Sequence, residues 1–329
     1  MKKKSHWIFD IFKISLGLAL LVLSLWGINW NLLLSTLESV QSAWLIAAIA
    51  SIFVSLGLKV VRWHMLLRNY GIKVSLIQTC GAYFLGQASN IILPVRGGEV
   101  VRFGWLRSQQ QHGAAEIVTT IGIEKVLDLV FFLALSFLIT AYIPIQEIRQ
   151  NTISFAIGGF FLTIALLAVI WLMPGVWQAN RGKIENRVPV RFHSILVGID
   201  RWMSESKLVR QPKYLFPVVG VTLSIWIVML TTNLILLRSF GLPAQIVAGG
   251  LVLVTVYLGV LPALMPGNIG PFYFFTNLAL TPFGINPQVR IAYAILLHAT
   301  VTIPPLILGG CFVLFSRRQF TYPDYQKIS

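Results

Sequence analysis

Charged residues are scarce in this sequence: Asp, Glu, Lys and Arg make up 11% of its 329 residues, whereas a soluble domain carries roughly 25%. This scarcity excludes an ordinary soluble globular protein. Hydrophobic residues make up 56% of the chain, which excludes intrinsic disorder. Long uncharged runs occur instead, and about 20 such residues are needed to cross a bilayer as a helix. The sequence therefore predicts a polytopic membrane protein.

Cysteines and the short motifs of soluble enzymes are also scarce. The two cysteines, Cys80 and Cys311, have no Cys or His at metal-ligand spacing, which argues against a disulfide scaffold and a zinc site. No Walker lysine motif, G-x-S-x-G, His-Glu-x-x-His or dinucleotide fingerprint is present. We therefore expect no metal, no cofactor, no catalytic residues and no ATP-driven transport by this chain alone.

Acidic residues are few beside basic ones: 11 Asp and Glu stand against 26 Lys and Arg, a net charge of +15. Most basic residues lie in short tracts beside apolar runs, which is typical of the positive-inside rule and of contact with anionic headgroups. We expect membrane lipids, anionic or phosphate-bearing, as partners and no nucleic acid. The basic residues of Met1–Lys4, 62–75, 181–213 and Arg317-Arg318 predict that these segments, and both termini, are cytoplasmic.

Apolar runs of spanning length recur along the chain. No small-residue cleavage site follows the first, which therefore predicts an uncleaved transmembrane helix rather than a signal peptide. The predicted spans cover about 11–28, 43–61, 117–143, 153–173, 214–237, 246–265 and 291–316.

The apolar stretch 76–94 does not fit as a full span. A crossing there would place the basic residues from Arg96 to Arg107 outside, and the two following spans would then place 181–213 outside as well. The conflict disappears if 76–105 enters the bilayer and returns on the same side. Irregular backbone at that depth is tolerated only beside protein or a water-filled cavity, so this element predicts a polar cavity.

A second broken element is predicted over 259–283. Paired broken segments in two halves of a chain point to a transporter site and to an internal repeat, with chance Pro/Gly punctuation as the alternative. The matched positions are Leu85-Gly86, Pro94 and Gly98 in the first element and Leu258-Gly259, Pro266 and Gly270 in the second.

These patterns predict one all-α integral membrane domain over 1–329, with about seven to eight transmembrane helices and two broken or re-entrant elements. The basic loop 181–213 also contains an amphipathic helical pattern. Its apolar face comprises Phe192, Ile195, Leu196, Ile199, Trp202 and Met203. A plain interfacial helix and a regulatory or lipid-recruiting role are the two interpretations.

The break at Pro94 is followed by groups that suit an anion. Pro94 and Gly97 interrupt the helix, and a new helix can begin near Gly98 with free N–H groups that favour negative charge. Arg96 adds a planar guanidinium suited to phosphate. Together with Asn90, these residues predict a headgroup phosphate site, and a cytoplasmic turn with surface charges is the alternative.

Two further groups of charges share helix faces. Glu99 lies three residues before Arg102 and can hold it in place or leave it partly free. Glu124 and Asp128 lie four apart, around Lys125, at the start of a predicted span. Charges at bilayer depth cost roughly 2.5–3.5 kcal/mol each, so they usually pair or line a water path. They could pair with the preceding arginines, or one carboxylate could carry a coupling proton; a structural ion pair and interfacial exposure are the alternatives.

The segment Pro266-Gly267-Asn268-Ile269-Gly270 carries no charge and cannot neutralise a phosphate alone. Its glycines predict a hinge or a site lining, with a simple turn as the alternative. His298, inside the last span, fits a hydrogen-bonded helix contact better than a proton relay.

Three motifs occur in order along the chain: Asn90…Pro94-x-Arg96-x-Gly98-Glu99-x-x-Arg102, Glu124-Lys125-x-x-Asp128, and Pro266-Gly267-Asn268-Ile269-Gly270. In this order they resemble those of the flippase-like membrane proteins related to the transmembrane flippase region of lysylphosphatidylglycerol synthase. The resemblance covers about 10–316. It implies a multi-pass inner-membrane protein that moves, or helps to move, a lipid or lipid-linked headgroup between leaflets. Family members can carry a fused aminoacyl-transferase domain, which we do not expect in a chain that stops at Ser329.

We therefore expect translocation of an anionic lipid or lipid-linked headgroup across the cytoplasmic membrane, through a charge-lined intramembrane cavity, and no enzyme activity. One alternative is an integral-membrane enzyme that acts on a lipid phosphate or lipid-linked sugar and uses Glu99, Glu124 or Asp128 as base or metal ligand. The other is a non-transporting assembly partner. A homo-oligomer or a lipid-synthesising enzyme as partner is compatible with the sequence.

Overall fold

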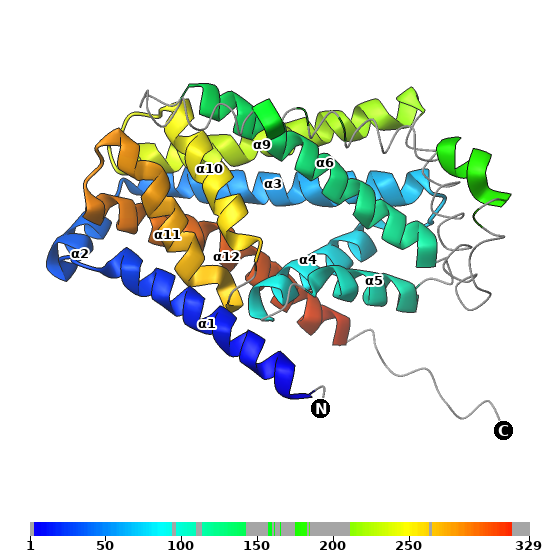
Figure 1. Ribbon diagram of the computed structural model, residues 1–329, viewed down its shortest axis with the longest axis horizontal. Coiled ribbons are helices and arrows are strands. Elements are labelled where there is room, and N and C mark those ends of the chain that lie inside the picture. The colour runs from blue at the N-terminus through cyan, green and yellow to red at the C-terminus, as the bar shows by residue number, and fades with distance from the viewer. Residues whose placement is uncertain are drawn as a thin grey trace.

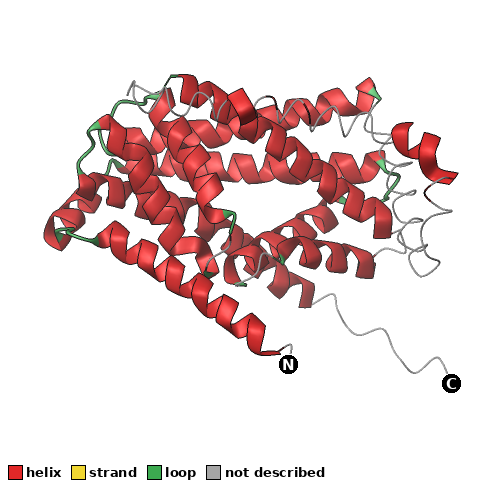
Figure 2. Cartoon of the chain, in the orientation of Figure 1, coloured by secondary structure: helices red, strands yellow, loops and turns green. Residues whose placement is uncertain are grey.

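The computed structural model of the chain describes residues 3–93, 97–109, 114–142, 157–159, 161, 165, 175–182, 184, 211–262 and 265–317. Within these residues the regular structure is helical throughout and contains no strand (Figure 2). The all-α prediction is therefore confirmed for the described part of the chain. The predicted span over 153–173 falls mostly outside these residues, as does the apolar face of the predicted interfacial helix.

The helices fall into two series of similar order. The first series, after α1 (Lys3–Leu25) and α2 (Trp30–Glu38), comprises α3 (Ser42–Asn69), α4 (Leu76–Ile92), α5 (Gly98–Gln109) and α6 (Ala114–Ala141). The second comprises α9 (Pro212–Ser239), α10 (Ile246–Val260), the 3-10 turn η3 (Pro266–Asn268), α11 (Ile269–Leu280), the 3-10 turn η4 (Thr281–Phe283) and α12 (Pro287–Arg317).

Three described helices are long and apolar enough to cross a membrane: α3, α9 and, over Pro287–Leu314, α12. A fourth crossing is formed if Ile11–Leu25 and Trp30–Glu38, which meet at 82°, make one broken span. Large apolar side chains such as Phe53, Ile227 and Ile303 remain exposed on these helices, as expected for surfaces that face lipid. A membrane location follows, while the count of seven to eight spans stays a prediction.

Both long helices that open the two series end in the same way. Gly71 follows α3 at φ 73°, and Gly241 follows α9 at φ 70°. In both turns the glycine N–H donates to an arginine carbonyl, of Arg68 at 3.0 Å and of Arg238 at 2.9 Å. Glycine suits this left-handed C-terminal position because it has no Cβ to clash.

Helix α3 extends further than the sequence predicted. The predicted span ended at residue 61 and the loop began at 62, but α3 continues to Asn69. Trp63, Leu66 and Leu67 are fully buried and extend its apolar face, so packing favours two more turns. The prediction that Arg62 lies in a cytoplasmic loop is therefore wrong.

After α4 the chain reverses direction and α5 packs back against α4. Gly86 and Gly98 bring the two backbones together, since a Cβ on either glycine would meet the carbonyl oxygen of the other. Asn90 fixes the reversal, because its side-chain oxygen accepts a hydrogen bond of 2.8 Å from the Gly98 N–H. Helix α4 has 17 residues, a length of about 25 Å. A hairpin of this kind is the geometry that the predicted re-entrant element requires.

A second hairpin is formed by α10 and α11. Thr255 of α10 donates a 3.3 Å hydrogen bond to the Phe275 carbonyl of α11, and a Cβ at Gly259 would meet the Phe275 ring. The break between them contacts the first hairpin, since α4 packs against η3. The 3-10 turn η3 of the second hairpin therefore contacts helix α4 of the first.

Helices α3 and α9 lie side by side and antiparallel, with α9 above α3 in the view of Figure 1. Arg62, late in α3, contacts Thr222, early in α9, while Ser51 contacts Thr232 at the other end. Each hairpin then packs on the last helix of the other series. Helix α4 packs on α12 and α10 packs on α6. Among the buried clusters of the described residues, one lies mainly around α3–α6 and another mainly around α9–α12, while a smaller one joins α6 with α9 and α10.

Candidate functional site

A chain of buried ion pairs joins α3, α5 and α6. Arg62 of α3 has a side chain only 1% exposed and donates two hydrogen bonds to Asp128 of α6, at 2.6 Å and 3.0 Å. Its Nη2 also lies 3.4 Å from the Oε1 of Glu124. Arg102 of α5 donates to both oxygens of the same Glu124, at 3.2 Å and 2.8 Å. Two arginines thus share one buried glutamate, and each forms a two-point contact with a carboxylate.

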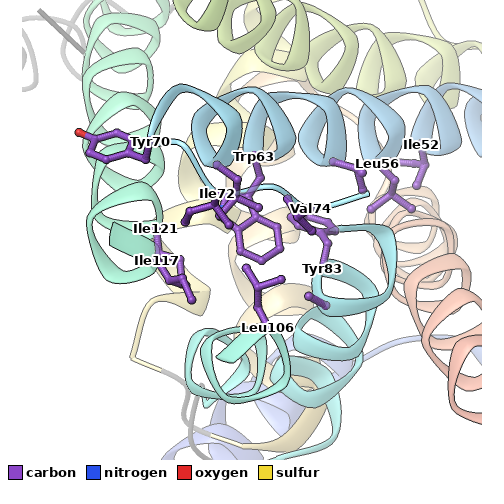
Figure 3. Packing of buried hydrophobic residues seen from close by; sticks show 13 residues of the cluster. Ile52, Leu56, Trp63, Tyr70, Ile72, Val74, Tyr83, Leu106, Ile117 and Ile121 are labelled. Atoms are coloured by element: carbon purple, nitrogen blue, oxygen red, sulfur yellow. The ribbon is translucent and has the colours of Figure 1, made fainter. Parts of the chain in front are cut away.

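Aromatic rings enclose the inner end of this chain. The Arg102 guanidinium lies 4.0 Å from the ring centroid of Trp63 and 4.8 Å from that of Tyr83. Figure 3 shows Trp63 pointing from α3 toward Tyr83 of α4 and Leu106 of α5. The indole N–H of Trp63 donates a 3.2 Å hydrogen bond to the Thr120 hydroxyl, so this buried donor has a partner. Stacking on electron-rich faces offsets part of the cost of burying this cation.

A more exposed pair lies at the edge of the chain. Glu99 accepts an ion pair from Lys125 at 2.7 Å, with side chains 29% and 52% exposed respectively. The sequence interpretation in which Glu99 holds Arg102 is wrong. Glu99 forms its ion pair with Lys125, and Arg102 forms its ion pair with Glu124. Helix α6 supplies both Glu124 and Lys125, and their different depths follow from adjacent positions on a helix facing different directions. The predicted pairing of Glu124 with a preceding arginine is confirmed.

The cluster holds one positive charge more than negative. Its cations are Lys59, Arg62, Arg102 and Lys125, and its anions are Glu99, Glu124 and Asp128. Lys59 interacts electrostatically with Asp128 and Glu124. It has no ion pair within 4.0 Å among the residues that the structure describes. By formal charge, Lys59 is therefore the cation of the cluster that lacks an ion pair among the described residues.

Several buried donors on α3 and α5 have no hydrogen-bond partner in the described structure. The side-chain oxygen of Ser55 and the Nε atoms of Arg62 and Arg102 are buried without a hydrogen-bond partner. Ser55, Lys59 and Arg62 follow one another at spacings of four and three, so they share a face of α3. Unsatisfied buried donors are costly, and hydrogen bonds to further oxygen atoms would satisfy them.

Sequence reasoning missed both Lys59 and Arg62. Lys59 was included in an apolar span, and Arg62 was assigned to a loop. The available signal was Gly71, a typical helix C-terminal glycine, which would have placed both residues inside the helix. Two cations three residues apart within an apolar helix would then have predicted buried partners.

The other predicted residues fall into three groups. Asn90, Gly97 and Gly98 form the turn into α5, where Gly97 accepts from the Val101 N–H at 3.0 Å. Pro94 and Arg96 lie outside the described residues. Near α11, a Cβ on Gly270 would meet the Gly17 carbonyl of α1, so this glycine allows close packing of two helices.

The segment Pro266–Asn268 is held in an unusual backbone conformation. Gly267 has φ 68° and Asn268 has φ 52°, both in the left-handed region. His298 of α12 donates a 2.8 Å hydrogen bond to the Gly267 carbonyl, which confirms its predicted role as a hydrogen-bonded contact. The ionic cluster and this segment belong to different series, and no charged residue occurs between Ser239 and Val289.

The described part of the chain contains no group of three or more His, Cys, Asp or Glu side chains arranged to hold a metal ion. The three carboxylates of the cluster are instead paired with arginine or lysine. The interactions that the structure shows in the cluster are ion pairs within the protein.

Comparison with known proteins gives one family and one relative. The family described as "Lysylphosphatidylglycerol synthase TM region" matches residues 11–309. A protein named Glycosyltransferase AglD, from Haloferax volcanii, is 25% identical over 327 aligned positions, which cover 89% of this chain and 52% of the relative. The chain thus spans about half the length of that relative. No solved structure matches.

Proposed function

The chain belongs to the family of the lysylphosphatidylglycerol synthase TM region, and on that premise we propose that it translocates an anionic lipid or lipid-linked headgroup across the cytoplasmic membrane. A polar headgroup does not cross hydrocarbon readily, because each unpaired polar or charged group loses its hydration. A charged surface inside the protein lowers that barrier without covalent chemistry. The buried cluster around Glu124 is the part of the molecule suited to this task.

The observation that carries the proposal is the unpaired Lys59 beside the paired arginines. A purely structural network would be neutral, since an uncompensated charge within an apolar helix costs free energy in every molecule. An anionic headgroup supplies the missing negative charge and accepts hydrogen bonds from Ser55 and the arginine Nε atoms. We assign Lys59 the first contact with the phosphate and Arg62 and Arg102 a supporting role. Arg96, on the segment after α4, remains a proposed entry contact.

An inverted internal repeat is the second element of the proposal. Helices α3 and α9 both have 28 residues, α5 and α11 both have 12, and Gly71 and Gly241 end the first helix of each series. The antiparallel contact of α3 with α9 supports a two-fold axis that runs in the membrane plane. Such repeats allow one half to rock against the other around a central site. The remaining spans, to a total of seven to eight, belong to this proposal.

Lipid translocation can be tested with vesicles that contain the purified protein and a fluorescent phosphatidylglycerol. Dithionite bleaches only the outer leaflet, so a translocating protein increases the bleached fraction over time. Vesicles with wild-type protein should lose nearly all fluorescence, and protein-free vesicles about half. Equal bleaching of the two preparations would contradict the proposal. A change in the lipid's mass that depends on a divalent metal would instead favour the enzyme interpretation.

A further inference from the structure

The second series of helices contains an apolar cavity of about 160 Å³. It lies between α3, α9, α10, α11 and α12. The side chains around it include Ile52, Val252, Val256, Phe272, Leu297 and Val301. The lining carries no charged residue. Water needs two to four polar partners to occupy a cavity stably, so this lining favours a hydrocarbon occupant.

The few polar groups at the cavity are already satisfied. Thr232 is hydrogen-bonded to Ser51 at 2.7 Å and to the Val228 carbonyl at 2.8 Å. The Asn233 amide donates to the Met229 carbonyl at 2.9 Å, and its oxygen accepts from the Tyr293 hydroxyl at 2.9 Å. An apolar occupant therefore leaves no buried donor or acceptor of Thr232 or Asn233 unpaired.

The cavity occupies the place in the second series that the ionic cluster occupies in the first. Gly71 and Gly241 are 170 residues apart, and the same offset relates Lys59 to Met229 and Arg62 to Thr232. Helices α6 and α12 begin at Ala114 and Pro287, 173 residues apart. That offset relates Glu124 to Leu297 and Asp128 to Val301, which both line the cavity.

The correspondence also holds across the two series. Thr222 of α9 contacts Arg62 in the cluster, and its counterpart on α3, 170 residues earlier, is Ile52, which lines the cavity. Charged groups thus occupy one position, and uncharged, mostly apolar side chains line the cavity at its counterpart. Ile52 and Arg62 are ten residues apart on α3, a separation of about 15 Å along the helix. An extended lipid chain can cover this distance.

We propose that this cavity binds a segment of a lipid hydrocarbon chain, alkyl or isoprenoid, while the headgroup of the same molecule is held at the ionic cluster. An enclosed apolar cavity of about 150 Å³ takes up benzene, so the space suits a segment of roughly six carbons. The inference rests on the proposed lipid translocation. It differs from leaving the whole chain in the bilayer, because part of the chain enters the cavity between α3 and the helices of the second series.

Photo-cross-linking tests this site in vesicles. The probe is a phosphatidylglycerol with a diazirine near the methyl end of one acyl chain, and adducts are located by peptide mass spectrometry. Adducts on Met229, Tyr257 or Val260, at the cavity, should fall at least fivefold in Val256→Phe, which fills the space. The control Leu258→Phe lies on the same helix at an exposed position and should leave them unchanged. Val260→Phe, at a partly exposed position, serves if Val256→Phe does not fold.

Two further comparisons show whether the hydrocarbon chain in the cavity belongs to the lipid held at the ionic cluster or to a resident lipid. Lys59→Gln should reduce the cavity adducts if the chain belongs to the lipid held at the cluster, whereas adducts that persist would assign the cavity to a resident lipid and overturn the coupling to the headgroup. Adducts that are spread equally over exposed helix faces, or that survive Val256→Phe, would overturn the site itself. Labelling needs no transport: cavity adducts without translocation would contradict only the proposed function, and translocation without cavity adducts only this inference.

Discussion

Arg62 of α3 and Asp128 of α6 lie 66 residues apart in sequence, and two hydrogen bonds of 2.6 Å and 3.0 Å join them inside the molecule. This pair ties the first long helix to the helix that carries Glu124. Burying two charges costs free energy that their attraction only partly offsets. Removing one partner therefore destabilises the protein more than replacing both partners with apolar residues. The pair therefore has a measurable consequence for stability.

The first prediction concerns the stability of the ionic cluster. Arg62→Ala removes the partner of the partly buried Asp128 and one of the two arginines that contact the buried Glu124, and it should lower the free energy of unfolding by about 3–5 kcal/mol. The measurement is chemical or thermal unfolding of the purified protein in detergent. Arg62→Met combined with Asp128→Leu removes both charges and should lose less than Arg62→Ala alone. Direct pairing would be contradicted if the double variant lost as much free energy of unfolding as Arg62→Met and Asp128→Leu lose when added together.

A second prediction concerns the close contact of α4 with α5. A Cβ at Gly98 would meet the backbone oxygen of Gly86, which cannot move independently of α4. Gly98→Ala should therefore lower the free energy of unfolding by about 1–3 kcal/mol, the usual cost of overpacking. Gly104→Ala is the matched control on α5, since nothing lies within 4 Å of a Cβ there. It should be neutral or slightly stabilising, because alanine favours helices. Equal losses in the two variants would contradict the packing of the hairpin.

The inverted repeat predicts opposite sides of the membrane for its two glycine turns. Lys73, after Gly71, and Gln245, after Gly241, are both exposed. In a background without Cys80 and Cys311, Gln245→Cys should react with an impermeant maleimide added to intact cells. Lys73→Cys should react only after the membrane is opened. Labelling of both from one side would contradict the antiparallel arrangement of the two halves across the membrane.

The sequence was sufficient for the helical class and for the location of the breaks. Apolar runs predicted α3, α6, α9 and α12 because a helix that faces lipid needs little besides apolar side chains. The conflict over basic loops predicted a re-entrant element over 76–105; the structure packs α5 back against α4, and the return to the same side of the membrane stays a prediction. Loop charges alone were enough for this prediction, because the positive-inside rule counts basic residues and does not depend on how the helices pack.

The partners within the cluster were harder to predict. Spacing placed Glu99 and Arg102 on one face, but spacing along one helix says nothing of the helix opposite. Arg102 is instead held by Glu124, 22 residues later. Arg62 was missed because α3 continues past its apolar run, and tertiary packing of Trp63 extends the helix. The apolar cavity had no sequence signal, since its lining residues resemble any other buried aliphatic residues.

The most direct test of the account is the rate of phosphatidylglycerol translocation by Lys59→Gln compared with Lys73→Gln in reconstituted vesicles. Both substitutions remove one positive charge, but only Lys59 carries the excess charge of the buried cluster, and Lys73 lies exposed in the turn after α3. We predict that Lys59→Gln slows translocation at least tenfold while Lys73→Gln retains the wild-type rate. A Lys59→Gln protein that folds and translocates at the wild-type rate would contradict the claim that the excess charge handles the headgroup.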